Sequence, residues 1–299
     1  MINFFFDKNI INKSFSKAAP TYDASSNLQR DVGDYLIKIL SGFQGELQNC
    51  KAYSHYDNQK KQRNSPPAGK TPPLALDIGC GTGALSNSLA CKYPHVNFFG
   101  CDLSLPMLFK ARERLQGKNI RLLSSDCEFL PFRNSRFDQV ISSLTYQWIP
   151  DIERAFSEVW RILKPKGLFI FSILGPRTLE ELRASYKKTE ETLGKKGFIT
   201  FMKFQEIERI SQNLKDTGFE NLLLENALNL KHYKNLWELL RTLKATGAAP
   251  SFPNGEKSLA RGLILKETAK IYQKNYPSPC GTGISAVYHI IFAVAQKKM

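Results

Sequence analysis

The stretch LALDIGCGTGALS, residues 74–86, decides the fold of this chain. A short apolar strand runs into a loop with glycines at alternate positions, Gly79, Gly81 and Gly83, and then into a run compatible with a helix. Such a loop lets the backbone approach a ligand closely. Dinucleotide-binding loops more often have G-x-G-x-x-G spacing, and the Asp77 carboxylate before the first glycine would repel a pyrophosphate. The loop therefore favours a ligand with an ammonium group and no pyrophosphate.

Short apolar strands alternate with helices from Leu74 onward. We expect strands at residues 74–78, 96–102, 120–126, 137–143 and 167–173, with helices at 105–115 and 152–163, the latter closed by Lys164-Pro165-Lys166-Gly167. Two late strands, 221–230 and 286–295, bring the sheet to seven, and residues 176–217 and 235–247 are predicted to be helical. The pattern predicts an α/β protein with a Rossmann-like, doubly wound sheet of five parallel and two late strands.

Two further acids follow strands of this predicted sheet. Asp102 ends the second strand and suits ribose hydroxyls, because a carboxylate can accept hydrogen bonds from both. Asp126 ends the third strand, where it would meet the amino group of an adenine. Each acid alone is equally typical of a helix cap or a turn. Three acids at the carboxyl edge of one sheet together predict a nucleoside-binding site.

The flanking segments differ in composition. Residues 9–40 predict two helical pieces, whereas residues 44–73 are polar, basic and proline-rich, with too few apolar residues to pack. Six cysteines without a C-x-x-C pair and four dispersed histidines predict no metal site and no disulfide framework. No apolar run reaches the length of a signal peptide or a membrane span, so we expect a cytoplasmic protein without a membrane segment.

The net charge of +15 favours an acidic partner: nucleic acid, an anionic membrane surface or an acidic protein. Alternatively, the charge reflects an organism whose proteins are generally basic, and then it indicates no particular partner. Enzymes that modify the amines of nucleic-acid bases often carry an Asn/Asp-Pro-Pro-aromatic loop that holds the flipped base, and residues 142–148, SSLTYQW, which follow the fourth strand, lack one. Nucleic acid is therefore the less favoured partner.

Residues 74–175 resemble the class I methyltransferases that use S-adenosylmethionine, in the glycine loop, the acids and the layout of residues 137–172. The resemblance implies that Asp77 and the glycines line the methionine part, Asp102 the ribose, and Asp126 with Cys127 the adenine. The full cofactor set that it implies is Tyr22, Gln29, Arg30, Asp77, Gly79, Cys80, Gly81, Gly83, Asp102, Leu103, Met107, Asp126, Cys127, Glu128 and Ser143.

A narrower resemblance covers four stretches: SFSKAAPTYDASSNLQRDVGDYL (14–36), SLTYQW (143–148), RTLKATGA (241–248) and YHIIFAVA (288–295). They are similar to the malonyl-[acyl-carrier protein] O-methyltransferase family of biotin synthesis. This resemblance implies methylation of the free carboxylate of a malonyl thioester on acyl carrier protein. It also implies a helical leader over the active site (1–43), an insertion (44–73) and a methyltransferase domain (74–299) with a substrate-recognition segment (176–217).

A malonyl carboxylate is ionised at pH 7, so no general base is required and none is expected. For orienting the substrate we expect Tyr22, Gln147, Trp148, Arg241 and Lys244. Arg241 and Lys244 stand at i and i+3 and can share one helix face, although a solvated face is equally typical. Trp148 is equally typical of a core anchor, whereas His289, within an apolar strand, is more typical of a core histidine than of a base.

The acidic carrier protein is expected to dock on lysines of the recognition segment: Lys187, Lys188, Lys195, Lys196 and Lys203. Two other functions stay open. One is methylation of a quinone-like acceptor, and the other is a descendant of the fold that does not methylate and acts as an assembly factor or hydroxylase.

Overall fold

A computed structural model describes residues 7–47, 72–194, 201–249, 259–279 and 281–299. Its seven-stranded sheet has the order β3-β2-β1-β4-β5-β7-β6. The strands are β1 (Leu74–Ile78), β2 (Asn97–Asp102), β3 (Ile120–Ser124), β4 (Phe137–Ser143), β5 (Leu163–Leu174), β6 (Phe219–Tyr233) and β7 (Ile284–Lys297). β1 to β5 pair in parallel, and β7 runs antiparallel to both β5 and β6. The predicted fold class is confirmed, including the two late strands.

The central strand β1 explains why this fold forms. All its residues are buried, and Leu76 pairs with Phe99 of β2 on one side and Val140 of β4 on the other. A strand covered on both faces must be apolar throughout, as LALDI nearly is. Asp77 is the exception in this strand, and it stands next to the glycine loop. The carboxyl ends of β1, β2 and β4 therefore meet at one edge of the sheet.

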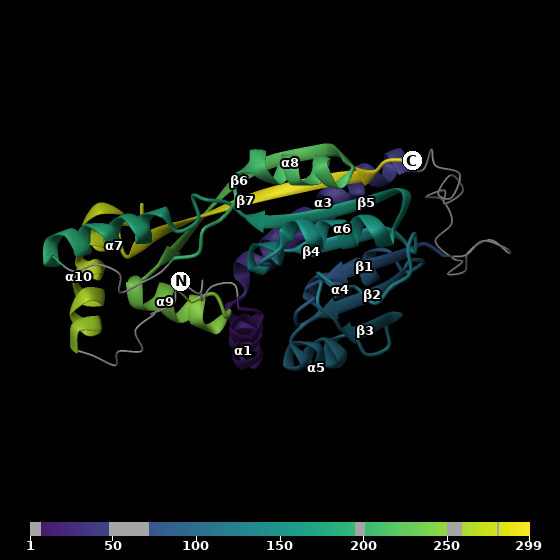
Figure 1. The fold of residues 1–299 in the computed structure, drawn as a ribbon. Coiled ribbons are helices and arrows are strands. Elements are labelled where there is room, and N and C mark those ends of the chain that lie inside the picture. Colours follow the sequence, from purple (N-terminus) through teal and green to yellow (C-terminus); the bar gives the residue numbers. More distant parts are fainter. Residues whose placement is uncertain (1–6, 48–71, 195–200, 250–258, 280) are drawn as a thin grey trace.

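Helices cover both faces of the sheet (Figure 1). They are α1 (Lys8–Ala18), α2 (Tyr22–Ser25), α3 (Asn27–Leu47), α4 (Ala84–Lys92), α5 (Leu105–Arg114), α6 (Ile152–Ile162), α7 (Glu180–Leu193), α8 (Ile207–Thr217), α9 (Leu236–Ala245) and α10 (Leu259–Asn275). α3 packs Val32, Leu36 and Leu40 into the core of one face. α6 and α8 close the other face, where Phe156 and Leu214 are fully buried.

Several boundaries differ from the sequence prediction. The leader forms three helices instead of two, and α3 continues to Leu47, past the predicted boundary at residue 43. The stretch Lys164-Pro165-Lys166-Gly167 does not close a helix but belongs to β5: Leu163 already pairs with Phe137, and a register shift before Gln139 accommodates the extra residues. Residues 48–71 of the predicted insertion and the predicted loop around residues 250–255 lie outside the described residues.

The strands β6 and β7 are long and carry a separate group of helices at their far end. In Figure 1, α7 and α10 lie beyond the main sheet, and α9 lies between them and α1. A hydrogen bond of 3.0 Å from the Thr268 hydroxyl to that of Thr189 joins α10 to α7. The α9 end meets the leader, where Thr21 Oγ1 donates to the Ala245 carbonyl (3.5 Å). Among the described helices, none combines the length and apolar character that crossing a bilayer requires.

Candidate functional site

The glycine loop between β1 and α4 is held against the neighbouring strand. The backbone N–H groups of Gly79 and Cys80 both donate to the Cys101 carbonyl, at 2.8 and 3.0 Å. Gly79 and Gly81 have φ of +69° and +54°, a conformation that side chains other than hydrogen disfavour. A Cβ on Gly79 would lie 2.2 Å from Thr145 Oγ1, whereas one on Gly81 would meet nothing within 4 Å. The first glycine permits close packing, and the second leaves open space for a ligand.

Asp102 ties the loop to the end of β2. Its carboxylate accepts a hydrogen bond from Gly81 N (2.9 Å) through one oxygen and from Ser104 N (2.8 Å) through the other. Burial raises the pKa of Asp102, and these backbone donors oppose the rise. Each oxygen retains a second lone pair, so the carboxylate can still accept from two hydroxyl groups of a ligand. This arrangement fits the predicted contact with a ribose.

Asp77 lies beneath the loop rather than on its surface. Its side chain is only 1% exposed, and Ser86 Oγ donates to it at 2.5 Å. Burial raises the pKa of Asp77 to about 7, the Ser86 hydrogen bond opposes this, and the nearby Asp102 charge adds to it. The expected direct contact between Asp77 and the ammonium group of a ligand is not what the geometry provides. The residue instead anchors the first turn of α4.

The raised pKa of Asp77 predicts a pH-dependent stability. An unfolded aspartate ionises near pH 4, so between pH 4 and 7 the folded state holds the extra proton and stability falls as the pH rises. Asp77→Asn removes this penalty and keeps an acceptor for Ser86. We expect its free energy of unfolding, relative to the wild type, to increase by roughly 3 kcal/mol between pH 5 and pH 8. Urea titrations at the two pH values measure this difference, and a constant difference would contradict it.

The first cavity, called the glycine-loop cavity below, lies where β1, β2, β3 and β4 end. Several residues expected to hold the cofactor line it: Tyr22, Gly79, Gly81, Asp102, Leu103, Met107, Asp126, Cys127 and Ser143. The leader adds Lys8, Ile11, Asn12 and Phe15, which the sequence prediction missed. Ile11 and Phe15 stand at i and i+4, so the amphipathic spacing of α1 was the available signal.

The remaining cofactor candidates lie elsewhere. Gln29 faces a second cavity, described below, and the exposed Arg30 donates to the Asp23 carbonyl at 2.8 Å. Cys80 is buried within the loop, and a Cβ on Gly83 would press on Leu115 and Ala111. Glu128 is buried and receives ion-pair contacts from Lys8 and a hydrogen bond from Asp151 N (3.0 Å). Among the described wall residues these five candidates do not line the glycine-loop cavity.

The charges of the glycine-loop cavity match a nucleoside without phosphates. Lys8 is the one cation on its described walls, and Lys8 is paired with Asp126 (2.5 Å) and with Glu128. Asp102 and Asp126 contribute two carboxylates. A pyrophosphate would need uncommitted donors or cations, whereas ribose hydroxyls and an adenine amino group need acceptors. The residues present therefore fit an adenosine that carries a positive charge.

A partly exposed ion pair joins the leader to the region of the glycine loop. Arg114 Nη2 lies 2.8 Å from Asp23 Oδ2, and Thr82 Oγ1 donates to Asp23 Oδ1 at 2.7 Å. Arg114 also donates to the Thr82 carbonyl at 2.8 Å. A second contact joins Ser16 of α1 to Ser104 after β2, at 2.9 Å between hydroxyl oxygens. The helices α1 and α2 thus contact residues at the sheet edge and form part of the same site.

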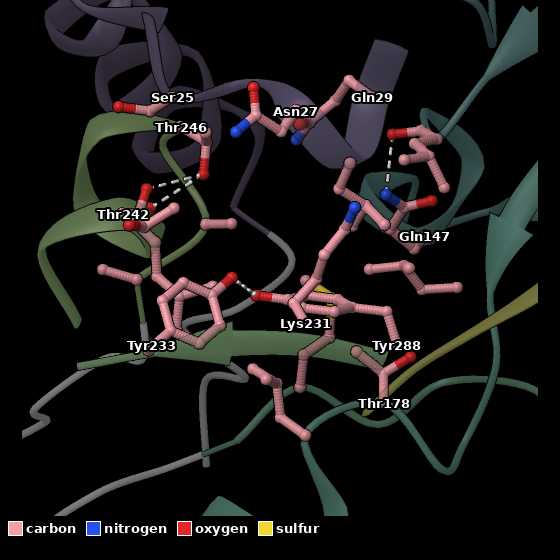
Figure 2. A pocket seen from close by; sticks show the side chains of 18 of the residues that line it. Ser25, Asn27, Gln29, Gln147, Thr178, Lys231, Tyr233, Thr242, Thr246 and Tyr288 are labelled. Carbon is pink, nitrogen blue, oxygen red and sulfur yellow. Dashed lines mark hydrogen bonds between the residues drawn. The ribbon is translucent and has the colours of Figure 1, made fainter. Parts of the chain in front are cut away.

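A second cavity of about 340 Å³ adjoins the first on the side of β5, β6 and α9. Its polar wall residues include Ser25, Asn27 and Gln29 from the leader, Lys231 and Tyr233 from β6, Thr242 and Thr246 from α9, Tyr288 from β7, and Thr178 (Figure 2). Tyr233 and Tyr288 join their hydroxyl groups at 3.0 Å. Gln147 donates through Nε2 to the Leu144 carbonyl, which leaves its Oε1 buried with no partner among the described residues.

The two cavities share one wall, made of Phe15, Tyr22, Leu144 and Trp148. Phe15 meets Trp148 edge to face, with ring centroids 5.2 Å apart. Burial raises the pKa of Tyr22, and the charges of Asp102 and Asp23 add to this effect, so the phenol stays protonated. Tyr22 and Trp148, both expected as orienting residues, therefore stand where a group could pass from one cavity to the other.

Arg241 and Lys244 do not face the second cavity. Both side chains are exposed on α9, whose wall residues are Glu238, Thr242, Leu243 and Thr246. The helix is rotated so that the threonines at i and i+4 point inward, which turns Arg241 and Lys244 outward. The cations that do line the cavity are Arg183 of α7 and Lys231 of β6. His289 forms a core contact, with Nε2 2.8 Å from Asn226 Oδ1.

The comparisons with known proteins agree with this geometry. Residues 76–171 match the model of a methyltransferase domain family. A protein described as a methyltransferase from Bacillus halodurans C-125 shares the fold, with a TM-score of 0.54 and 19% identity over 78% of this chain and 95% of that one. The YcgJ protein of Bacillus subtilis has a TM-score of 0.53 at 16% identity, over 77% and 94% of the chains. Fold and site together define a class I methyltransferase, with S-adenosylmethionine as its cofactor.

Relatives of known name extend over almost the whole chain. The malonyl-[acyl-carrier protein] O-methyltransferase of Methylovorus sp. (strain MP688) is 31% identical over 98% of this chain and 90% of that protein. The enzyme of the same name from Geobacter sulfurreducens is 27% identical over 97% of this chain and 99% of that protein. The chain belongs to the malonyl-[acyl-carrier protein] O-methyltransferase family.

Proposed function

We propose that this protein transfers the methyl group of S-adenosylmethionine to the free carboxylate of a malonyl thioester on acyl carrier protein, in biotin synthesis. The relatives named for this reaction cover nearly the whole chain, including the leader and α9. The observation that carries the proposal is the wall that the two cavities share, because methyl transfer needs donor and acceptor sites that meet. Methylation removes the carboxylate charge, so the acyl group can enter fatty-acid assembly as a primer for pimelate.

Positioning and exclusion of water are the tasks of the protein in this reaction. S-adenosylmethionine supplies a methyl group that its sulfonium already activates. The malonyl carboxylate is ionised at neutral pH, so the protein need not remove a proton. Phe15, Leu144 and Trp148 present apolar surface at the shared wall and strip water from the attacking oxygen. The hydroxyl group of Tyr22 stands at the same wall and can donate a hydrogen bond to that carboxylate.

The leader is part of this proposal. Residues of α1, α2 and the start of α3 line one or both cavities, which supports a role as the cover of the active site. We propose that the chain divides into a leader, an insertion, and a methyltransferase domain that contains a recognition segment. We place the reaction in the cytoplasm, where fatty-acid assembly on carrier protein takes place.

A direct assay tests the proposed reaction. The purified full chain is incubated with methyl-labelled S-adenosylmethionine and, in parallel, malonyl-acyl carrier protein, malonyl-coenzyme A and a quinone precursor. We expect label in a base-labile ester on the malonyl thioesters. Label on the quinone precursor instead would assign the other methyltransferase function, and no label on any acceptor would favour an assembly role.

Docking of the acidic carrier protein on the recognition segment is also a proposal. Lys187, Lys188 and Lys203 are exposed, while Lys195 and Lys196 lie outside the described residues. Lys187 follows Arg183 by one helical turn, so cations on α7 continue outward from the second cavity. Opposite charge of this kind speeds association and fixes orientation.

Replacement of Lys187, Lys188 and Lys203 by alanine tests this surface. We expect the KM for malonyl-acyl carrier protein to rise about fivefold to tenfold at low salt, with kcat unchanged, and the difference to shrink at high ionic strength. The matched control replaces Lys38 and Lys92, exposed lysines on α3 and α4, of which Lys38 stands about 16 Å along the helix from the cavity residue Asn27. A KM equal to that of the control would place docking elsewhere.

A further inference from the structure

We propose that Arg183 recognises the substrate carboxylate that is methylated, an inference that rests on the proposed function. Arg183 lies in the first turns of α7, is half-buried, and lines the second cavity. Its guanidinium group donates to the Pro176 carbonyl. The ion pairs among the described residues include none with Arg183. A half-buried guanidinium with spare donors in a cavity wall calls for an anion.

The other acidic and basic side chains on the described walls of the second cavity already have hydrogen-bond or ion-pair partners. Lys231 forms an ion pair with Asp31 of α3. Glu238 accepts a hydrogen bond from Lys234 N at the start of α9. His232 Nδ1 lies 3.3 Å from Ser285 Oγ. Arg183 is therefore the wall cation that has no ion-pair partner among the described residues.

The position of Arg183 relative to the shared wall supports this role. β4 and β5 are adjacent parallel strands, and Leu144 N donates to the Ser172 carbonyl at 3.0 Å. Leu174 ends β5 and Thr178 follows it, and both line the second cavity together with Leu144 and Arg183. An acyl group bound in this cavity is therefore enclosed by the shared wall and by Arg183. Arginine suits this task because its planar fork holds a carboxylate in a fixed orientation.

The partial burial of the Arg183 guanidinium group favours the binding of an anion. Burial lowers the pKa of Arg183, and the charges of Glu180 and Glu181 only partly oppose this. The cost of desolvating the cation is recovered when an anion enters the cavity. In the reaction the carboxylate oxygen bonds to the methyl carbon, the carbon–sulfur bond breaks, and the sulfur keeps the electron pair. The product ester is neutral, so it loses the attraction to Arg183 and is released more readily than the substrate.

The phosphate of the prosthetic group on the carrier protein is the other anion that Arg183 could bind. Two substrates, one with and one without this phosphate, distinguish it from the malonyl carboxylate. Malonyl-N-acetylcysteamine has the carboxylate and the thioester but no phosphate. Arg183→Met and Arg183→Lys are assayed with this substrate and with malonyl-acyl carrier protein. Arg177→Met is the matched control, because Arg177 is exposed, pairs with Glu180 and does not line the described cavity wall.

We expect kcat/KM for malonyl-N-acetylcysteamine to fall at least about 100-fold in Arg183→Met and about 10-fold in Arg183→Lys. Affinity for S-adenosylmethionine and for the methyl ester product should stay within about threefold of the wild type, since neither bears the recognised carboxylate at this position. Arg177→Met should resemble the wild type.

Two outcomes would overturn the assignment. A loss with the carrier-bound substrate alone would place Arg183 at the phosphate, and an equal loss of affinity for the ester product would indicate a general structural role. If Arg183→Met does not fold, the lysine variant and the product-binding measurement decide. Failure of the proposed function is distinguishable, because then the wild-type protein itself would not methylate malonyl-N-acetylcysteamine or the carrier-bound substrate.

Discussion

Asp102→Ala is expected to abolish measurable binding of S-adenosylmethionine. The carboxylate accepts hydrogen bonds from Gly81 N and Ser104 N at 2.9 and 2.8 Å, and it lines the glycine-loop cavity, where we expect it to bind the ribose. Two charge-assisted hydrogen bonds to ribose hydroxyls are together worth about 3 kcal/mol or more, which corresponds to at least about a 100-fold loss in affinity. Isothermal titration calorimetry with S-adenosylmethionine and S-adenosylhomocysteine measures it.

The control for this prediction separates binding from folding. Asp102→Asn keeps one carbonyl oxygen as an acceptor and should retain part of the affinity. Circular dichroism and thermal unfolding of both variants should remain close to the wild type, because removal of the Asp102 charge also removes the cost of burying it. Binding by folded Asp102→Ala within threefold of the wild type would refute the cofactor assignment at this position.

Gly79→Ala is expected to have the largest effect on stability. The new Cβ would lie 2.2 Å from Thr145 Oγ1, and Thr145 donates hydrogen bonds to the Ile78 and Ser143 carbonyls at 3.3 and 3.2 Å, so it cannot move aside cheaply. Left-handed backbone adds a further penalty. We expect a loss of at least about 3 kcal/mol in the free energy of unfolding, measured by urea titration.

Gly81→Ala is the matched comparison in the same loop. It shares the left-handed backbone, but nothing lies within 4 Å of the added Cβ. The loss of stability should be about 1 kcal/mol, while affinity for S-adenosylmethionine should fall at least about 10-fold because the methyl group enters the glycine-loop cavity. Equal effects of the two substitutions on stability would contradict the distinct roles given to these glycines.

Much of the cofactor site was predictable from the sequence. Parallel strands end at one sheet edge, so the residues that follow β1, β2, β3 and β4 had to converge there. Gly81, Asp102, Asp126 and Ser143 accordingly line the glycine-loop cavity. Asp77 is the exception: its position before the first glycine predicted a contact with the ligand, but its side chain is buried and accepts a hydrogen bond from Ser86.

The contribution of the leader was harder to predict. Asp23 of the leader contacts Thr82 and Arg114, which lie 59 and 91 positions later in the chain. Lys8 similarly reaches Asp126 across 118 positions. No local pattern in the sequence specifies such partners, since they depend on how α1 and α2 dock on the finished sheet edge.

The second cavity shows most clearly which features the sequence predicts and which depend on tertiary packing. Helical spacing predicted that Arg241 and Lys244 share one face of a helix. The spacing does not tell which side of α9 faces the cavity. Packing of Leu236, Leu239 and Leu243 into the core sets the rotation of α9 and turns Thr242 and Thr246 to the cavity. Arg183, which no motif marks, reaches the cavity because α7 follows β5 directly.

The sequence by itself determined the sheet, the edge at which its parallel strands end, and hence the place and chemical class of the methyl donor. These follow from periodicity, strand burial and the glycine loop, which act over a few residues. Only the tertiary structure decided which charges line the second cavity and how the leader packs against the sheet edge. That choice depends on the rotation of each helix about its axis and on contacts between distant segments, and core packing fixes both.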